Sequence, residues 1–272
     1  MKKSLIAAAA VMLGVSGAHA ADIAARPYTK APVPAAAYDW SGFYVGVNAG
    51  YGWDDRSVSY VPNNAIMVTG STFPSSTWNN SGALGGVQIG YNRQIGRQWV
   101  AGVETDINAS DIKGSAVATS PVSFGAAFFA ASQKVDWFGT VRARLGWLPS
   151  DRFLVFATGG LAYGHVGEDI SLTRPSGVNV RNGVYGFSCS PNETCFAGAS
   201  SGVRAGWTAG AGFEYALLQN LTAKAEYLYV DLGGNSVIGT AFRGNGGIPA
   251  SYTANFSSLS FNIVRAGLNY RF

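Results

Sequence analysis

Eight segments of this chain alternate between large apolar residues and small or polar ones. In one of them, Val141 and Leu145 occupy one parity, while Thr140 and Arg142 occupy the other. Successive side chains of a β-strand point to opposite faces, so the pattern predicts strands with one apolar and one polar face. The eight segments are 42–53, 81–92, 98–109, 134–148, 152–166, 203–216, 220–231 and 258–272.

The composition agrees with β-structure and excludes other classes of protein. Gly accounts for 36 of 272 residues, and charged residues make up only 12%, against about 25% in ordinary soluble domains. Beyond the extreme N-terminus, no apolar run approaches the roughly 18 residues of a membrane helix, which excludes a multi-span helical membrane protein. The formal net charge of +4 is spread without a basic cluster, so we expect no nucleic-acid partner.

The connections between the segments alternate strictly between short and long. The short ones are about 93–97, 149–151 and 217–219. The long ones, expected to be loops, are about 54–80, 110–133, 167–202 and 232–257. Such alternation collects all tight turns at one end of a meander, which is typical of transmembrane β-barrels with short periplasmic turns and long extracellular loops.

Aromatic residues at both ends of the segments indicate that the apolar face is the outer face. Trp137 and Trp147 are ten positions apart, a separation that covers about 25 Å of height in a tilted strand and matches the apolar band of an outer-membrane barrel. The opposite face is rich in glycine and would coat the surface of a soluble barrel poorly. The expected girdles are Trp99, Trp147, Phe153, Tyr215 and Phe272 near the short turns, and Tyr51, Trp137, Tyr163, Trp207 and Tyr229 near the loops.

Closure follows because every backbone group in hydrocarbon must be paired, and only a closed sheet has no edge. The predicted fold is all-β, an eight-stranded antiparallel transmembrane up-and-down β-barrel. A ten-stranded alternative, with extra strands inside 54–80 or 167–202, stays open at this stage.

The polar parity assigns a set of charged side chains to the lumen. They are Glu104, Asp106, Asp136, Glu214 and Glu226, with Arg142, Arg144, Arg204, Lys224, Arg265 and Arg271. Five acids and six bases nearly balance, and an eight-stranded barrel is just wide enough for its side chains to fill it. We therefore expect a salt-bridged plug, with a narrow ion path as the alternative.

The N-terminus reads as an export signal. Residues 1–20 combine a basic start, a short apolar core and a small-x-small site, so cleavage is expected between Ala20 and Ala21. Residues 21–38 form a Pro/Ala-rich periplasmic leader, a possible contact with peptidoglycan, and 39–272 form the barrel. Export to an oxidising compartment predicts a local disulfide between Cys189 and Cys195.

No motif points to an enzyme or a cofactor. The chain has no phosphate loop, no metal-binding helix motif and no GxSxG elbow, and we expect no cofactor, no metal and no catalysis. One candidate nucleophilic group, His165 with Glu168, Asp169 and Ser171, reads better as polar residues at the headgroup level. Basic residues of the long loops either dock an anionic or host ligand or are simply solvated; they are Arg56, Lys113, Arg174, Arg181 and Arg243.

Several motifs carry a resemblance over about residues 38–272. They are YDWSGFYVGVNAGYGW, DWFGTVRARLGW, TGGLAYG, GWTAGAGFEYALLQNLTAKAEYLYVDLG and VRAGLNYRF. The chain resembles the small porin-family outer-membrane proteins of alphaproteobacteria, of the OmpA-like eight-stranded barrel type. The resemblance implies a surface-exposed protein of the Gram-negative outer membrane that supports envelope integrity, in contact with lipid and lipopolysaccharide.

The same resemblance extends to the C-terminus. Tyr270 and Phe272 look like the signal by which the barrel assembly machinery recognises its substrates. A narrow porin and a surface ligand-binding or adhesion protein acting through the long loops are the alternative functions.

Overall fold

The computed structural model describes residues 38–64, 73–122, 125–244 and 247–272. The expected signal peptide, its cleavage site between Ala20 and Ala21 and nearly all of the leader lie outside the described residues. Within the described part of the chain, no helix is long and apolar enough to cross a membrane. The strands are β1 (Gly42–Pro62), β2 (Ser75–Ile95), β3 (Trp99–Val122), β4 (Gly125–Ser150), β5 (Phe153–Arg174), β6 (Val178–Asn182), β7 (Tyr185–Cys189), β8 (Glu193–Ala216), β9 (Leu221–Asp231), β10 (Asn235–Ala241), β11 (Ile248–Pro249), β12 (Ser251–Phe256) and β13 (Ser260–Arg271).

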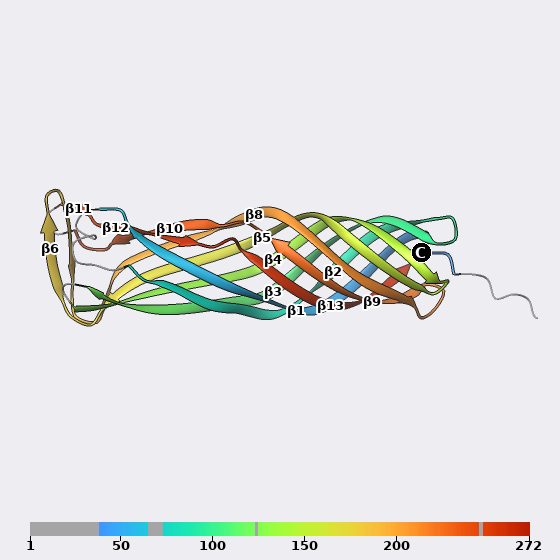
Figure 1. Ribbon diagram of the computed structural model, residues 1–272, viewed down its shortest axis with the longest axis horizontal. Coiled ribbons are helices and arrows are strands. Elements are labelled where there is room, and N and C mark those ends of the chain that lie inside the picture. Colours follow the sequence, from blue (N-terminus) through green and yellow to red (C-terminus); the bar gives the residue numbers. More distant parts are fainter. Residues whose placement is uncertain (1–37, 65–72, 123–124, 245–246) are drawn as a thin grey trace, which may run out of the picture. The chain divides into compact units, whose positions relative to one another are not determined.

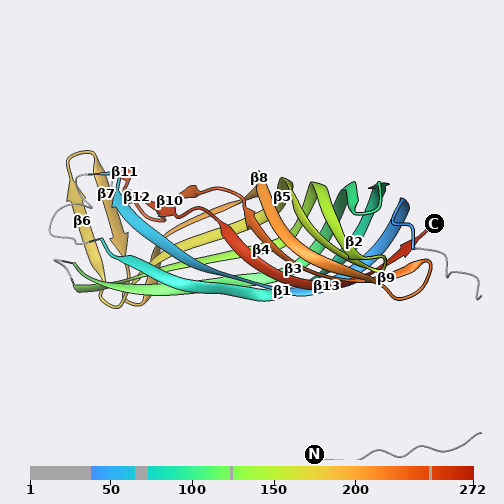
Figure 2. The same cartoon turned by 45° about the vertical axis from the view of Figure 1, so that its right-hand side comes forward.

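The long strands form a closed antiparallel ring. Its order is β1-β2-β3-β4-β5-β8-β9-β13, and β13 pairs back onto β1. Val47, for example, lies opposite Val87 of β2 on one side and Leu268 of β13 on the other. The strands wind round one axis in both ribbon views (Figures 1 and 2). The predicted eight-stranded antiparallel barrel is confirmed.

Six strands of the ring, β1 to β5 and β8, are longer than predicted. β1 has 21 residues and β4 has 26, because much of the expected loops 54–80 and 110–133 continues the strands. Asp54 to Ser59 pair with Asn80 to Ser75, and Ser115 to Ser120 pair with Ser132 to Ala127. The prediction that these segments are loops is therefore wrong. The alternation continues through them, but its apolar side chains change faces.

Two of the eight strands of the ring are interrupted, and their separate pieces do not add strands to the ring. β9 ends at Asp231 and β10 begins at Asn235, after Gly233 has taken a φ of 74° that favours glycine. β12 and β13 are likewise separated by residues 257–259. Beyond these breaks β10 pairs with β8 and β12 pairs with β1, so the ring still has eight strands. The ten-stranded sheet is therefore an eight-stranded barrel with two broken strands, and the strands within 167–202 do not widen it.

The strands of the ring build two regions that differ in how they are filled. We call the part between the aromatic girdles the membrane-spanning barrel, and the continuation of the strands toward the long loops the outer barrel. In the outer barrel an apolar core fills the interior and includes Val58, Trp78, Phe129, Phe196 and Tyr252. A separate sheet of β6, β7 and β11, which we call the cap, packs Phe187 and Cys189 into this core.

Candidate functional site

A compact cluster of charges occupies the interior of the membrane-spanning barrel. Arg142 pairs with Glu104, with Asp106 at 3.1 Å and with Glu226 at 2.5 Å. Arg265 lies 3.0 Å from Asp106 and 2.8 Å from Glu226, and Lys224 lies 2.8 Å from Glu104. All six side chains are buried. Three carboxylates and three bases therefore neutralise one another inside the barrel.

The strand sequences and their register place these charges at a similar height along the barrel axis. Each occupies an inward parity, and the strand register sets Glu104 opposite Arg142 and Glu226 opposite Arg265. The inward glycines make room for the long side chains: a Cβ added at Gly46 would clash with the amide of Asn269. Buried charges are tolerated when they are paired and hydrogen-bonded, as they are here.

A ring of polar groups extends the cluster toward the short turns. Arg144 pairs with Glu214, and the guanidinium lies 3.8 Å from the centre of the Phe156 ring. The Tyr44 hydroxyl donates to Glu104 at 2.7 Å. Gln88 links Asn48 and Asn269 with hydrogen bonds of 2.9 and 2.6 Å. Apart from Asp136, Arg204 and Arg271, the predicted lumen residues thus lie either in the central cluster or in this adjoining polar group.

Apolar layers cover these polar groups at both ends, toward the short turns and toward the outer barrel. On the side of the short turns, Trp40 is buried against Val100, Leu148 and Leu154, and its indole donates to the Asp151 carbonyl at 3.0 Å. On the side of the outer barrel lies a second apolar layer: Leu84, Ile112, Val135, Phe138, Ala162, Val166, Leu228, Val230, Leu232, Leu259, Phe261 and Ile263. The charged cluster is therefore enclosed by apolar side chains.

Arg271 and Arg204 lie away from the central network to which the sequence assigned them. The Arg271 guanidinium covers the Tyr38 ring at 4.3 Å, at the short-turn end of the barrel. Arg204 pairs with Glu168 at 2.6 Å in a second polar cluster above the apolar layer. Glu168 was expected beside His165, but the two residues are three positions apart on β5. An odd separation places their side chains on opposite faces of the strand, so Glu168 points inward.

The second polar cluster also contains Arg56, which lies within one of the expected loops, 54–80. Its guanidinium donates to Gln133 at 2.9 Å and to the carbonyls of Ser257 and Ser258. It is fully buried and stabilises the break between β12 and β13. Arg174 is also buried, whereas Lys113 remains exposed beside Asp111.

Asp136 lies on the outer face, not in the lumen. The pairing of β4 with β5 shifts between Val135 and Trp137, so Asp136 is the extra residue of a β-bulge. Its carboxylate meets Nδ1 of His165 at 2.8 Å and Lys134 at 3.1 Å. Counting parity along the sequence missed this position because one inserted residue reverses which parity faces the interior on the two sides of the bulge.

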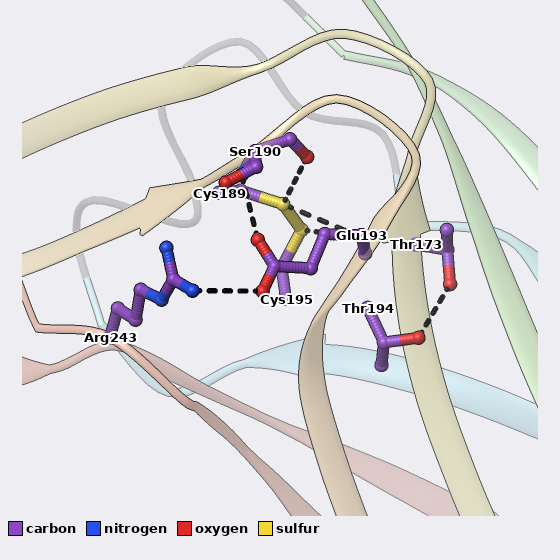
Figure 3. Close-up of a disulfide and its surroundings, with 7 residues drawn as sticks. All are labelled: Thr173, Cys189, Ser190, Glu193, Thr194, Cys195 and Arg243. Carbon is purple, nitrogen blue, oxygen red and sulfur yellow. Dashed lines mark hydrogen bonds and ion pairs between the residues drawn. A yellow bond between two sulfur atoms is a disulfide. The ribbon is translucent and has the colours of Figure 1, made fainter.

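The expected disulfide between Cys189 and Cys195 is present, at the junction of the cap with β8. The two Cα atoms are 5.3 Å apart, and both residues are buried beside Phe187 and Phe196. Figure 3 shows the Glu193 carboxylate between Arg243 and Ser190; the Arg243 guanidinium is 3.2 Å away. Hydrogen bonds from Ser190 hold the pKa of Glu193 below its usual range.

The two residues of the expected assembly signal lie near the end of β13, with Phe272 directly after its last residue. The rings of Tyr270 and Phe272 face outward and lie 5.4 Å apart. No group of three or more His, Cys, Asp or Glu side chains with the arrangement of a metal site occurs among the residues the structure describes.

This architecture agrees with a family match over nearly the whole chain. A family model described as "Outer membrane protein beta-barrel domain" matches residues 6–272. The chain belongs to this family. Relatives in it include the 31 kDa outer-membrane immunogenic protein of Brucella melitensis, 36% identical over 100% of both chains. The 25 kDa outer-membrane immunogenic protein of Brucella abortus is 30% identical over 99% of this chain and 98% of its own.

A solved structure of an outer-membrane barrel is also similar. The outer membrane protein OprG of Pseudomonas aeruginosa has a TM-score of 0.44 at 13% identity, over 85% of this chain and 96% of its own. The family and the alphaproteobacterial relatives confirm the expected resemblance and the location in the outer membrane.

Proposed function

We propose that this protein is a non-conducting structural barrel that stabilises the envelope and holds a rigid platform on the cell surface. The supporting observation is the filling of the interior: apolar layers enclose the paired charges of the membrane-spanning barrel on both sides. A water-filled path needs polar walls along its whole length, and buried apolar layers oppose one. The salt-bridged plug is thus favoured over the narrow ion path.

The platform is the second part of the proposal. The outer barrel has its own apolar core, and the disulfide ties the cap to β8. By the orientation usual for such barrels, this end faces the outside of the cell. The Brucella relatives are named as immunogenic outer-membrane proteins, which supports surface exposure in the family. The apolar belt between the girdles would contact lipid and lipopolysaccharide.

Planar-bilayer recording of the refolded protein tests this function. We expect no stable conductance steps from the native chain, with a general porin as the positive control in the same bilayers. Arg142→Ala is the informative variant, because the guanidinium is fully buried among three carboxylates. Ohmic steps from the native protein whose amplitude or ion selectivity changes in Arg142→Ala would establish the narrow porin instead.

A surface-binding role through the cap is the second candidate. Val184 and Ile248 are 60% and 55% exposed, and the Ile248 amide donates to the Val184 carbonyl, so the two residues are neighbours in the cap. Exposed apolar side chains that cluster beyond the membrane are typical of binding surfaces. Replacement of both by Ser should abolish binding to cells or lipopolysaccharide vesicles if this role is real, with Val117→Ser on the outer barrel as the control.

A further inference from the structure

Three side chains on the outer face of the barrel form a connected hydrogen-bonded chain. Ser201 Oγ lies 3.2 Å from Nε2 of His165, and Nδ1 of the same ring lies 2.8 Å from Asp136. They come from three neighbouring strands, β8, β5 and β4. The bulge at Asp136 turns its carboxylate out to the histidine, and bulges of this kind recur beside active sites.

The partners fix the protonation pattern of this chain of bonds. An ionised carboxylate only accepts hydrogen bonds, so the His165 tautomer that fits this contact has its hydrogen on Nδ1, where the N–H donates a hydrogen bond to Asp136. Nε2 then carries a lone pair and accepts from the Ser201 hydroxyl. This is the arrangement that activates a serine: a nucleophile, a base within reach and a third group that orients the base.

The position of the three residues points to a lipid substrate. His165 pairs across the strands with Trp137, a residue of the girdle near the long loops, and the two rings are nearly parallel at 21°. Aromatic girdles lie at the membrane interface, where the polar ends of the acyl chains meet the headgroups. The Ser201 side chain is exposed there, so a lipid of the outer leaflet can reach it.

A cation lies in the same row of the sheet. Lys134, Gly167 and Ser201 face one another across β4, β5 and β8, and the stem of Lys134 lies over Gly167. The Lys134 ammonium, which also holds Asp136, can offset negative charge that develops near Ser201. Its side chain is 57% exposed, so we assign it a smaller contribution than the three bonded groups.

We propose that Ser201, His165 and Asp136 form a hydrolytic site for the carboxylic esters of membrane lipids. The Ser201 oxygen bonds to the ester carbonyl carbon while its proton passes to His165. The bond to the lipid alcohol breaks, and His165 returns the proton to the departing oxygen. Water, deprotonated by His165, then hydrolyses the acyl-serine, which releases a fatty acid and restores Ser201. Asp136 is a positioning residue.

This activity is independent of the structural role proposed above and differs from the sequence-based expectation that the chain is not an enzyme. It also departs from the sequence-based candidate at this place. Of the residues expected beside His165, Glu168 points inward, whereas Ser171 lies six residues further along β5. The serine that reaches the ring comes from β8, and sequence proximity gave no signal for it.

Covalent labelling tests the nucleophile directly. The refolded full-length protein is treated with a long-chain alkyl fluorophosphonate, which phosphonylates an activated serine with loss of fluoride, and peptides are analysed by mass. We expect label on Ser201, none in Ser201→Ala, and labelling at least 100-fold slower in His165→Gln and Asp136→Asn. Ser171→Ala is the matched control and should label like the native protein.

Fatty-acid release identifies the lipid. The same variants are assayed on p-nitrophenyl palmitate, dioleoylphosphatidylcholine vesicles and purified lipid A, and heat-modifiable gel migration verifies that each is folded. Release from lipid A alone indicates a glycolipid substrate, and release from the vesicles indicates a phospholipid. If the native protein takes no label and releases no more fatty acid than Ser201→Ala on all three substrates, the three residues are only a structural link between strands and the proposal is wrong.

Discussion

Two stretches of strand β1 place opposite chemistry on the same faces. From Phe43 to Trp53 the outward side chains are apolar or aromatic, and the inward ones are glycine, Asn48 and Tyr44. Beyond Trp53 the outward positions become mainly Asp and Ser, while Val58 and Tyr60 turn into the interior. The parity never breaks, so the strand itself is unchanged. The medium outside the barrel decides which face is apolar.

The two regions are consequently stabilised in different ways. In the outer barrel, water drives apolar side chains into a core, as in a soluble protein. In the membrane-spanning barrel, lipid is as apolar as any core, so the closed hydrogen-bonded ring and the paired interior charges hold the structure. A substitution should therefore have effects of different size in the two regions even where the strand and the face are the same.

The largest effect is expected from the core of the outer barrel. Phe129 is 1% exposed, and its ring lies 4.9 Å from that of Tyr60 and 5.6 Å from that of Tyr252. Phe129→Ala should destabilise this region by about 3–5 kcal/mol through the lost burial and the cavity left behind. Protease cleavage of the outer strands in intact cells measures the effect.

Phe128→Ala is the matched control, since this neighbouring ring faces outward and is 37% exposed. Its loss should leave the protease resistance near that of the native protein. Equal sensitivity of both variants would mean that the outer barrel has no core of its own.

A pair of arginine substitutions on β1 tests the comparison on one face. Val47→Arg places a charge on the lipid-facing side and should cost about 2–4 kcal/mol near the bilayer midplane. Ser57→Arg occupies the same face ten residues further on, in water, and should change stability by less than about 0.5 kcal/mol. Denaturant unfolding of protein refolded in lipid vesicles gives both values. Similar costs for the two would place the membrane boundary elsewhere.

The smallest effect is expected from the disulfide. Cys189 and Cys195 are six positions apart, and closing so short a loop contributes about 2 kcal/mol in the chain-entropy account. The double variant Cys189→Ser, Cys195→Ser should loosen the cap while heat-modifiable migration of the barrel stays normal. Hydrogen exchange of β6 and β7, compared with that of β9, separates the two regions. Faster exchange throughout β9 would show that the cap supports the whole barrel.

Strand alternation was enough to predict the membrane-spanning barrel and most of its inward charges, because a lipid-facing strand carries the strongest periodic signal. The outer strands escaped prediction because serine, threonine and asparagine on an outward face read as loop composition. Residues such as Arg56 and Glu168 were misplaced for the same reason. Local insertions were also invisible: the bulge at Asp136 reverses which parity of β4 faces inward, although the apolar alternation along the sequence continues unchanged.

Strand β1 runs without interruption through both regions, so its sequence sets how far the protein extends above the membrane. The nine residues from Asp54 to Pro62 rise roughly 20 Å along the barrel axis when tilted like the rest of the strand. The outward side chains change from apolar to polar after Trp53, and this change fixes the depth of the barrel in the membrane. A vertical shift of the barrel would bury serines in lipid or expose valines to water. A macromolecule approaching the cell therefore meets the cap well before it reaches the lipid headgroups.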